Sequence, residues 1–336
     1  MTIYDIAKAC GVSIATVSRV LNGSNKVRPK TRDLVLAAMQ EQNYCPNPFA
    51  RGLGLDSMKM IGILCEDVSD AFFAKAVSLV EHDLRERGLD VILGCTGQEV
   101  AAKKKYLQIM LNKHVDAIIL IGSPFRDDVD NNQYIVDIAK KVPIVTINSL
   151  MEIDNIYCVV CDESSSFRQS VELLAASGHK SILYIYDRLT YSGQQKIKGY
   201  RDGLMHMGIK ENPKLIYKVR HTFSDTQALV TKLLEENLPF DAIMASEDLL
   251  AVGAEKALVA SGRSMPVIGC NNSILAECST PTLTSIDNRL EMLCPNAVDM
   301  VTKILRGEGN ALPSKSIFPS YLVFRDSFHP DIFSKK

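Results

Sequence analysis

The sequence has no apolar run that approaches the roughly 18 residues needed to cross a membrane, although the chain is 336 residues long. Its first 30 residues also lack the apolar core followed by small residues that marks a secretory signal. These two absences argue against an integral membrane protein and against an exported one. We therefore expect a cytoplasmic protein.

Motifs that mark common α/β enzymes are absent as well. There is no G-x-G-x-x-G between a predicted strand and a predicted helix, no phosphate-binding loop, no nucleophile elbow and no H-E-x-x-H motif. The six histidines are isolated from one another in the sequence. The sequence therefore predicts no catalytic residues, no cofactor and no enzymatic activity.

Cysteine is present, but its pattern indicates neither disulfides nor a metal site. The nine cysteines are odd in number and scattered, as in a reducing compartment. Cys158 and Cys161 form a C-x-x-C, which could indicate zinc or redox chemistry. They lie in the apolar segment Y-C-V-V-C, where an odd spacing places them on opposite faces of a strand. No second pair has zinc-finger spacing, so we expect buried, inert thiols.

The composition is that of a large protein with a full core. Apolar residues make up 46% of the sequence and charged residues 23%, and the length fits a small head plus a two-lobed body. Residues 1–60 hold eight lysines and arginines and four acidic residues, a formal charge of +4, whereas the remainder carries −5. A basic head on an acidic body suits contact with DNA at one end.

The head is predicted to contain a helix-turn-helix. Thr2 and Asp5 have the spacing of a capping box, and Gly11 can end the first helix in a left-handed conformation. Ser13 is the expected cap of a second helix, and Pro29 suits the first position of a third, from about residue 29 to 42. The side chains expected to face inward are Ile6, Ala7, Cys10, Val17, Val20, Leu21, Leu34, Val35, Ala38 and Met39.

The residues expected to face outward on the second helix are those of a recognition helix. Such a helix lies in a major groove with its N-terminal part against the base edges. Arg19 suits guanine because the guanidinium fork matches two acceptors on that base. Ile14 and Ala15 offer only apolar contact, and the hydroxyls of Thr16 and Ser18 suit phosphate contacts or caps. The alternative for Arg19 is simple neutralisation of backbone phosphate.

Short apolar runs alternate with helical patterns after residue 59, which predicts parallel sheets covered by helices on both faces. Ten strands exceed what one such sheet comfortably holds, so two lobes are expected. The predicted strands are 60–65, 90–95, 116–121, 143–148, 157–161, 181–186, 214–219, 241–246, 266–270 and 283–287. The predicted helices are 71–87, 99–113, 131–141, 164–177, 194–207, 225–236, 249–261 and 289–306.

Four motifs resemble the lactose-repressor/galactose-repressor (LacI/GalR) family of bacterial transcriptional regulators. They are Y-D-I-A at 4–7, G-V-S-I-A-T-V-S-R-V-L-N at 11–22, T-R at 31–32 and Y-C-P-N-P-F-A-R-G-L at 44–53. The resemblance implies a helix-turn-helix DNA-binding domain at 1–46, a hinge at 47–58 and a two-lobed, periplasmic-binding-protein-like domain at 59–336. Lobe one would take about 60–160 plus 289–312, and lobe two about 161–288 plus 313–328.

The resemblance also implies roles for individual residues of the head and hinge. Leu53 would pair with its dimer mate as a minor-groove wedge, and Arg51 would bind phosphate. The glycines at 52 and 54 disfavour helix, so the hinge is expected to fold only on DNA. The residues expected to contact DNA are Thr2, Tyr4, Ser13, Ile14, Ala15, Thr16, Ser18, Arg19, Asn22, Arg28, Thr31, Asn47, Arg51 and Leu53.

Proteins with parallel sheets bind ligands beyond the carboxyl ends of the strands. In two-lobed proteins this region is the cleft between the lobes. The residues expected to contact an effector are Asp70, Phe72, Phe73, Asn148, Lys196, Glu247, Asn271 and Asn288. Many relatives carry aspartates at the positions of Asn148 and Asn271, and an arginine at Lys196. The family implies a sugar or sugar derivative as ligand, and these departures change the polar pattern that would recognise it.

The resemblance implies a homodimeric repressor of carbohydrate-utilisation genes that binds a near-palindromic operator under control of a sugar-like effector. The alternatives are a catabolite-control-type global regulator with a protein or phosphorylated corepressor, and a sugar-binding transport protein. The transport protein would need export and no DNA-binding head. The segment 249–261 carries small residues that could join dimer contacts or pack on their own sheet, and the tail is too short for a tetramerising coiled coil.

Leu53→Ala is expected to reduce the bending of operator DNA while leaving effector binding intact, because a smaller side chain cannot unstack a base step. Bending is measured from the mobility of complexes on circularly permuted DNA fragments. Unchanged bending would refute the wedge role.

Overall fold

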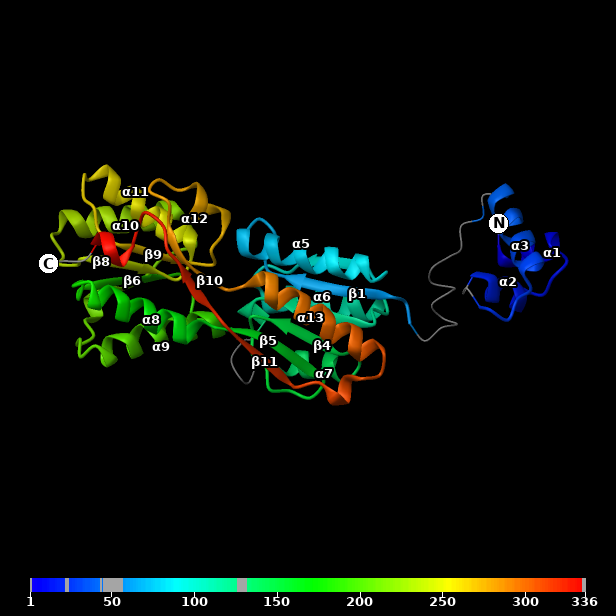
Figure 1. The fold of residues 1–336 in the computed structure, drawn as a ribbon. Helices are drawn as coiled ribbons and strands as arrows, with labels where there is room; N and C mark the ends of the chain where they lie inside the picture. Colours follow the sequence, from blue (N-terminus) through cyan, green and yellow to red (C-terminus); the bar gives the residue numbers. More distant parts are fainter. Residues whose placement is uncertain (1, 22–23, 43, 45–56, 126–131, 334–336) are drawn as a thin grey trace. The chain divides into compact units, whose positions relative to one another are not determined.

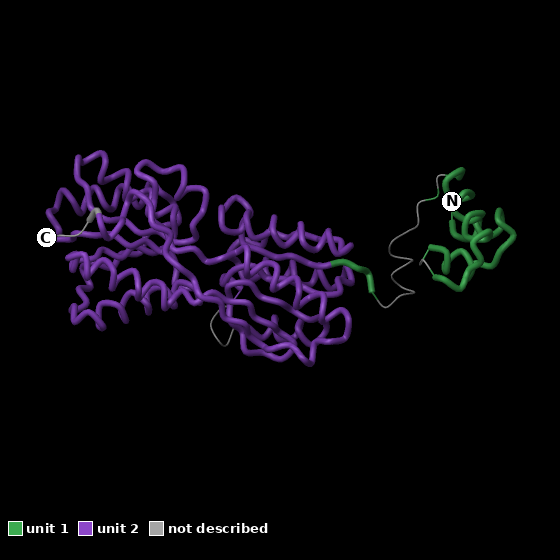
Figure 2. The backbone as a smooth tube through the Cα atoms, viewed as in Figure 1, with its two compact units in different colours: residues 1–60 green, residues 61–336 purple. Residues whose placement is uncertain are grey.

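The computed structural model describes residues 2–21, 24–42, 44, 57–125 and 132–333. It divides into two compact units, residues 1–60 and residues 61–336 (Figure 2). We refer to them as the head and the body. None of the helices described in either unit has the length and apolar character to pass through a bilayer.

The head consists of three helices, α1 (Ile3–Ala9), α2 (Ile14–Leu21) and α3 (Pro29–Glu41). Ile6, Val17 and Val35 are fully buried at the centre of a small core. One predicted core residue is wrong: Leu34 is 51% exposed. Val35 and Met39 are one helical turn apart and point inward together, so Leu34 is rotated about 100° away from the core.

The first lobe of the body is a six-stranded sheet in the order β11-β5-β4-β3-β1-β2. Its strands are β1 (Met60–Cys65), β2 (Asp90–Cys95), β3 (Ala117–Ile121), β4 (Ile144–Ile147), β5 (Ile156–Asp162) and β11 (Lys315–Pro319). Its helices are α5 (Ala71–Glu86), α6 (Val100–Asn112), α7 (Gln133–Ala139) and α13 (Leu290–Leu305).

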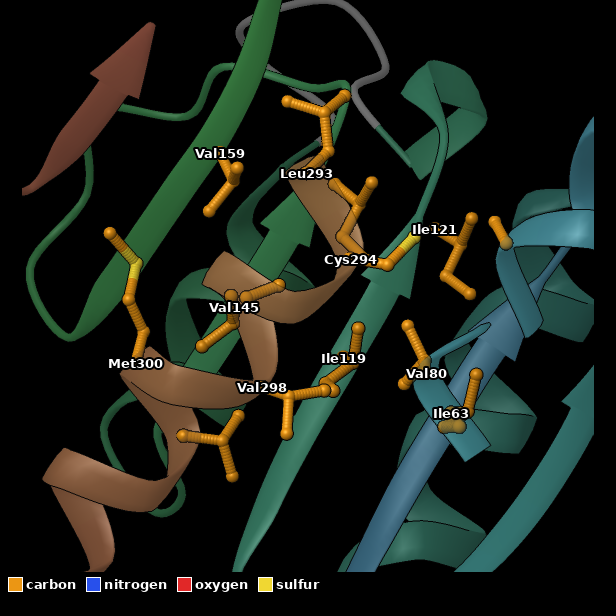
Figure 3. Close-up of a cluster of buried hydrophobic side chains, with 14 of the residues drawn as sticks. Ile63, Val80, Ile119, Ile121, Val145, Val159, Leu293, Cys294, Val298 and Met300 are labelled. Carbon is orange, nitrogen blue, oxygen red and sulfur yellow. The ribbon is translucent and has the colours of Figure 1, made fainter. Parts of the chain in front are cut away.

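Both faces of the first sheet are covered, as a buried parallel sheet requires. Figure 3 shows Val80 of α5 and Leu293 and Val298 of α13 packed over Ile63, Ile119 and Val145 of the sheet. On the opposite face, α6 comes so close that a side chain at Gly62 would meet Met110.

The second lobe is a six-stranded sheet in the order β12-β10-β9-β8-β6-β7. Its strands are β6 (Ile182–Tyr186), β7 (Ile216–Lys218), β8 (Ala242–Ala245), β9 (Val267–Cys270), β10 (Thr284–Asp287) and β12 (Tyr321–Val323). Its longer helices are α8 (Glu163–Ala176), α9 (Tyr191–His206), α10 (Phe223–Glu235) and α11 (Asp248–Ala260), and α12 (Ile274–Cys278) is short. Figure 1 shows α8 and α9 on one side of this sheet and α10 and α11 on the other.

The predicted fold class, a helical head followed by a two-lobed body with parallel sheets, is confirmed. All ten predicted strands are present. The segment 313–328 does not belong wholly to the second lobe as predicted. Its residues Lys315–Pro319 pair with β5 in the first sheet, and Tyr321–Val323 pair antiparallel with β10 in the second.

The small residues of α11 pack within their own lobe. Ala251, Ala254 and Ala257 are buried against the second sheet. Segment 249–261 is predicted either to join dimer contacts or to pack on its own sheet. These alanines pack on their own sheet. The exposed apolar residue of this helix is Val259.

Close packing of α9 on α8 fixes the position of the side chains that α9 carries toward the first lobe. A Cβ at Gly199 would clash with the backbone carbonyl of Ser164 and lie 2.8 Å from Cβ of Phe167. The absence of a side chain at Gly199 therefore lets the two helices approach each other.

Gly199→Ala is expected to lower the stability of the body by about 1–3 kcal/mol, because the added methyl group overpacks the α8–α9 contact. Lys198→Ala is the control, since it removes only an exposed ion pair with Asp202 on the same helix. Urea unfolding of the full chain measures both. Equal urea midpoints for the two variants would show that α8 and α9 are not tightly packed at Gly199.

Candidate functional site

Local hydrogen bonds determine where α1 and α2, the two helices of the helix-turn-helix, begin. The backbone N–H of Thr2 donates to Oδ2 of Asp5 at 2.8 Å, and this bond lowers the pKa of the Asp5 carboxyl. Gly11 adopts φ +61°, the left-handed conformation expected there. Oγ of Ser13 accepts from the backbone N–H of Thr16 at 3.2 Å. The predicted caps of α1 and α2 are confirmed.

The side of α2 that faces away from the core carries the residues predicted to contact DNA. Val17 and Val20 are buried on the inner side, whereas Ile14, Ala15 and Arg19 are exposed. The other exposed candidates are Thr2, Tyr4, Ser13 and Arg28, and the half-buried ones are Thr16, Ser18 and Thr31. Four further candidates, Asn22, Asn47, Arg51 and Leu53, lie outside the described residues.

The body contains a cleft in which side chains of both lobes meet. One part of it, which we call the inner chamber, is a cavity of about 50 Å³. Seven of the eight predicted effector contacts line it: Asp70, Phe72, Phe73, Asn148, Lys196, Glu247 and Asn271. Phe73 also belongs to the core of the first lobe, whereas Phe72 is only half-buried.

Lys196 is a buried cation on the second-lobe side of the inner chamber, with 2% of its side chain exposed. Its Nζ donates to the backbone carbonyl of Ser246 at 2.8 Å and to Oε1 of Glu247 at 3.1 Å, and it lies 3.5 Å from Oε1 of Glu163. Burial disfavours its charge, but the two carboxylates outweigh burial and hold the pKa of Lys196 well above its usual value. The lysine is therefore charged and fully engaged.

Glu163 also connects the lobes at the base of the chamber. Its Oε1 accepts from Oγ of Ser192 at 2.8 Å and from Nδ2 of Asn148, which ends β4 of the first lobe, at 3.3 Å. The carboxyl of Glu163 is fully buried. Ser123 of the first lobe adds a second bridge, between two hydroxyl groups, by donating to Oγ1 of Thr190 at 2.8 Å.

His221 bridges carboxylates that belong to different lobes. Its Nε2 lies 3.0 Å from Oδ2 of Asp70, at the start of α5, and its Nδ1 lies 3.1 Å from Oδ2 of Asp187, which follows β6. The hydrogen bonds to Asp187 and Asp70 raise the pKa of His221 to about 10. Burial opposes ionisation of Asp187, but the contacts with His221 and Arg188 lower its pKa. The imidazole is therefore a cation at neutral pH.

A second charged bridge lies beside the first. Nη1 of Arg188 is 2.6 Å from Oε1 and 2.5 Å from Oε2 of Glu66, the residue that follows β1. Nε of Arg188 binds Asp187 at 3.1 Å, and Nε2 of Gln98 donates to Oε1 of Glu66 at 2.9 Å. Two charge-assisted bridges thus hold the lobes together across the cleft.

Both strand-end asparagines adopt a backbone conformation that explains their residue type. Asn148 has φ +56° and Asn271 has φ +102°, and asparagine tolerates positive φ better than most residues. Nδ2 of Asn271 donates to Glu247.

Burial raises the pKa of two neighbouring acids at the start of α11. The pKa of Glu247 is raised to about 7, and that of Asp248, which binds Ser273 and Ser285, to about 6.

Asn288 is not a wall of the cleft, and the prediction of direct effector contact is wrong for this residue. It is 1% exposed and lines none of the described chambers. Its Nδ2 donates to Oδ1 of Asn271 at 2.7 Å. The strand end at Asn288 lies behind Asn271, so its side chain supports the wall without reaching the cavity.

The sequence analysis missed the charged groups that close the cleft: Glu66, Glu163, Asp187, Arg188 and His221. A signal was available for Glu66, Asp187 and Arg188, because they directly follow β1 and β6 as the other candidates follow their strands. His221 follows β7 at a distance of three residues, and Glu163 begins α8. No local pattern distinguishes these two from surface residues.

Both cysteines of the C-x-x-C lie in the protein interior, as predicted. Cys158 and Cys161 are buried, and Cys161 belongs to the core of the first lobe that excludes Cys158. Burial raises the pKa of the Cys161 thiol to about 12. Within residues 57–125, 132–333 and the described part of the head, no group of three or more histidine, cysteine or acidic side chains is arranged to hold a metal ion.

The protonated bridge predicts a pH dependence of stability. The pKa of His221 is raised from 6.5 to about 10, so its contribution is fully present below pH 6.5 and is lost as the pH rises through 10. His221→Gln is expected to cost about 1.5–3 kcal/mol at pH 6.5 and little above pH 10. Urea unfolding of wild type and variant at several pH values measures this difference. The control is His206→Gln, which alters a 67% exposed ion pair with Glu172; equal pH profiles of the two variants would contradict the bridge.

Comparison with known proteins agrees with this architecture. Residues 2–47 match the family of bacterial regulatory proteins called lacI, and residues 58–311 match the periplasmic binding proteins and sugar binding domain of the LacI family. An HTH-type transcriptional regulator of Lachnoclostridium phytofermentans is 43% identical over 330 residues, covering 97% of this chain and 98% of the relative. Catabolite control protein A of Priestia megaterium is 30% identical, covering 92% and 93%.

Solved structures give the same result. The lac repressor dimer bound to operator and the anti-inducer ONPF superposes with a TM-score of 0.87 at 25% identity, covering 97% of this chain and 98% of that one. The complex of the regulator CelR with cellobiose gives 0.71 at 26% identity, covering 98% and 100%. The resemblance seen in the sequence is thereby confirmed. The chain belongs to the LacI family and is a DNA-binding transcriptional regulator.

Proposed function

We propose that the protein is a homodimeric repressor of carbohydrate-utilisation genes whose affinity for operator DNA is set by a sugar-like effector in the cleft. The observation that carries this proposal is the cleft itself, where polar side chains of both lobes converge and are joined by bridges that can open. A ligand that prefers one lobe arrangement shifts the population toward it. The relatives are regulators, which supports a protein without catalytic activity that works in the cytoplasm.

The exposed face of α2 is the proposed reading surface for DNA. Arg19 would read guanine, while Ile14 and Ala15 would make apolar contact in the major groove. Thr16, Ser18 and Arg51 would bind phosphate, for which the formal charge of +4 on residues 1–60 is favourable. Two such heads related by dimer symmetry would recognise a near-palindrome.

Control by the effector would pass through the hinge at residues 47–58. We infer that opening or closing the cleft changes the spacing at which two hinges of a dimer meet DNA, which permits or prevents their folding. The dimer is supported by the lac repressor dimer, which superposes on nearly the whole chain. Of the cleft residues, Asp70, Phe72, Glu247 and Asn271 would contact the ligand. Lys196, bound to Glu247, and Asn148, bound to Glu163, would respond to it indirectly.

Arg19→Ala tests the reading surface. It is expected to weaken operator binding by about 1–3 kcal/mol and to relax base preference at one position in each half-site, because a bidentate contact to one base is lost. Enrichment from random oligonucleotides, followed by titration of the selected sites, measures both effects. The control is Lys8→Ala, which removes an exposed positive charge from α1.

Two outcomes would count against this assignment. An equal loss of affinity on all sequences would make Arg19 a phosphate contact. Failure of the wild-type protein to enrich any motif, with or without metabolite extract, would contradict the proposed repressor function.

A further inference from the structure

The cleft continues beyond the inner chamber into a larger space. This outer chamber has a volume of about 610 Å³ and is bounded by Glu66, Asp67 and Phe72 of the first lobe and by Arg188, His221 and Ile274 of the second. A third chamber of about 330 Å³ shares Phe72 and Ile274 with it. Together they form a groove that is lined in part by Arg188 and His221 of the charged bridges.

Room for a ligand lies in the outer chamber and not in the inner one. Small-molecule sites have volumes of roughly 300–1,000 Å³. The inner chamber, at about 50 Å³, holds little more than ordered water. Its lysine is already engaged by two carboxylates and a backbone carbonyl. The outer chamber has the size of a complete ligand site, and the third chamber extends it.

The charges around both chambers disfavour an anionic ligand. The cations are Arg188, Lys196 and His221, and each is paired with carboxylates of the protein. Even with Glu247 and Asp248 neutral, four carboxylates remain at the walls, at Glu66, Asp67, Asp70 and Asp187. A phosphate or carboxylate group on a ligand would find no uncommitted cation among these residues and would meet an excess of negative charge.

The outer chamber is lined by both polar and apolar side chains, which suits a hydroxyl-rich ligand. The carboxylates accept hydrogen bonds from hydroxyl groups. Phe72 and Ile274 offer apolar surface from opposite lobes, and Ile274 is 61% exposed. An aromatic side chain packs well against the apolar face of a sugar ring.

We propose that the effector is an uncharged saccharide of at least two rings that lies in the outer chamber between Phe72 and Ile274. This inference rests on the proposed control by a sugar-like effector and specifies the size and charge of that ligand. A single ring would leave much of the groove empty. A phosphorylated or acidic sugar is excluded by the committed cations.

The test compares matched probes on the full-length protein. The panel contains neutral monosaccharides (glucose, galactose, xylose), neutral di- and trisaccharides built from them, and the anions glucose 6-phosphate and glucuronate. At least one neutral di- or trisaccharide is expected to raise the melting temperature by about 2 °C or more at saturation and to change operator affinity, whereas the single rings and the anions do neither.

Ile274→Asp locates the ligand, because it adds a negative charge to the outer chamber at an exposed position that tolerates it. It is expected to weaken binding of the active saccharide at least about tenfold. Met205→Asp is the control, since this 73% exposed residue of α9 lines none of the three chambers. Equal saccharide affinity in the two variants would overturn the placement.

The remaining outcomes separate the inference from the proposed function. If a monosaccharide or an anion is the active probe, the inference is overturned while control by a sugar-like effector stands. If no probe changes melting temperature or operator affinity, control by a sugar-like effector fails and the inference fails with it. Motif enrichment by the same protein would still establish DNA binding in that case.

Discussion

The interaction on which the body depends is a positive charge shared by two lobes. His221 lies between Asp70 and Asp187, and its raised pKa of about 10 keeps it charged at neutral pH. Without that proton, two carboxylates would face each other across a partly desolvated space and repel. The neighbouring pair of Arg188 and Glu66 acts in the same way. The two lobes are thus joined across the cleft by charge.

Rigid packing surrounds these bridges. α5 and α13 pack as a continuous apolar layer on the first sheet, and α8 and α9 approach each other closely at Gly199 on the second. Such closely packed layers resist gradual deformation.

The predicted effector residues and the residues that line the cleft overlap because one rule places both. Parallel strands bring their carboxyl ends to one edge of each sheet, and Asp70, Asn148, Glu247 and Asn271 follow such ends. The rule does not say how far each side chain reaches, which is why Asn288 lies behind the wall. In the head, apolar character alone did not predict burial. Leu34 is apolar, but it lies on the exposed side of its helix.

The sequence by itself determined the helix-turn-helix, the alternation of strands and helices and most of the cleft residues, because caps, glycine turns and apolar periodicity act over a few residues. Only the tertiary structure decided which charges meet. Glu66 and Arg188 are 122 residues apart in the chain, and Asp70 and His221 are 151 apart. It also decided that β11 and β12 lie in different sheets. These contacts depend on how two separately folded sheets are set against each other, and no local pattern encodes that arrangement.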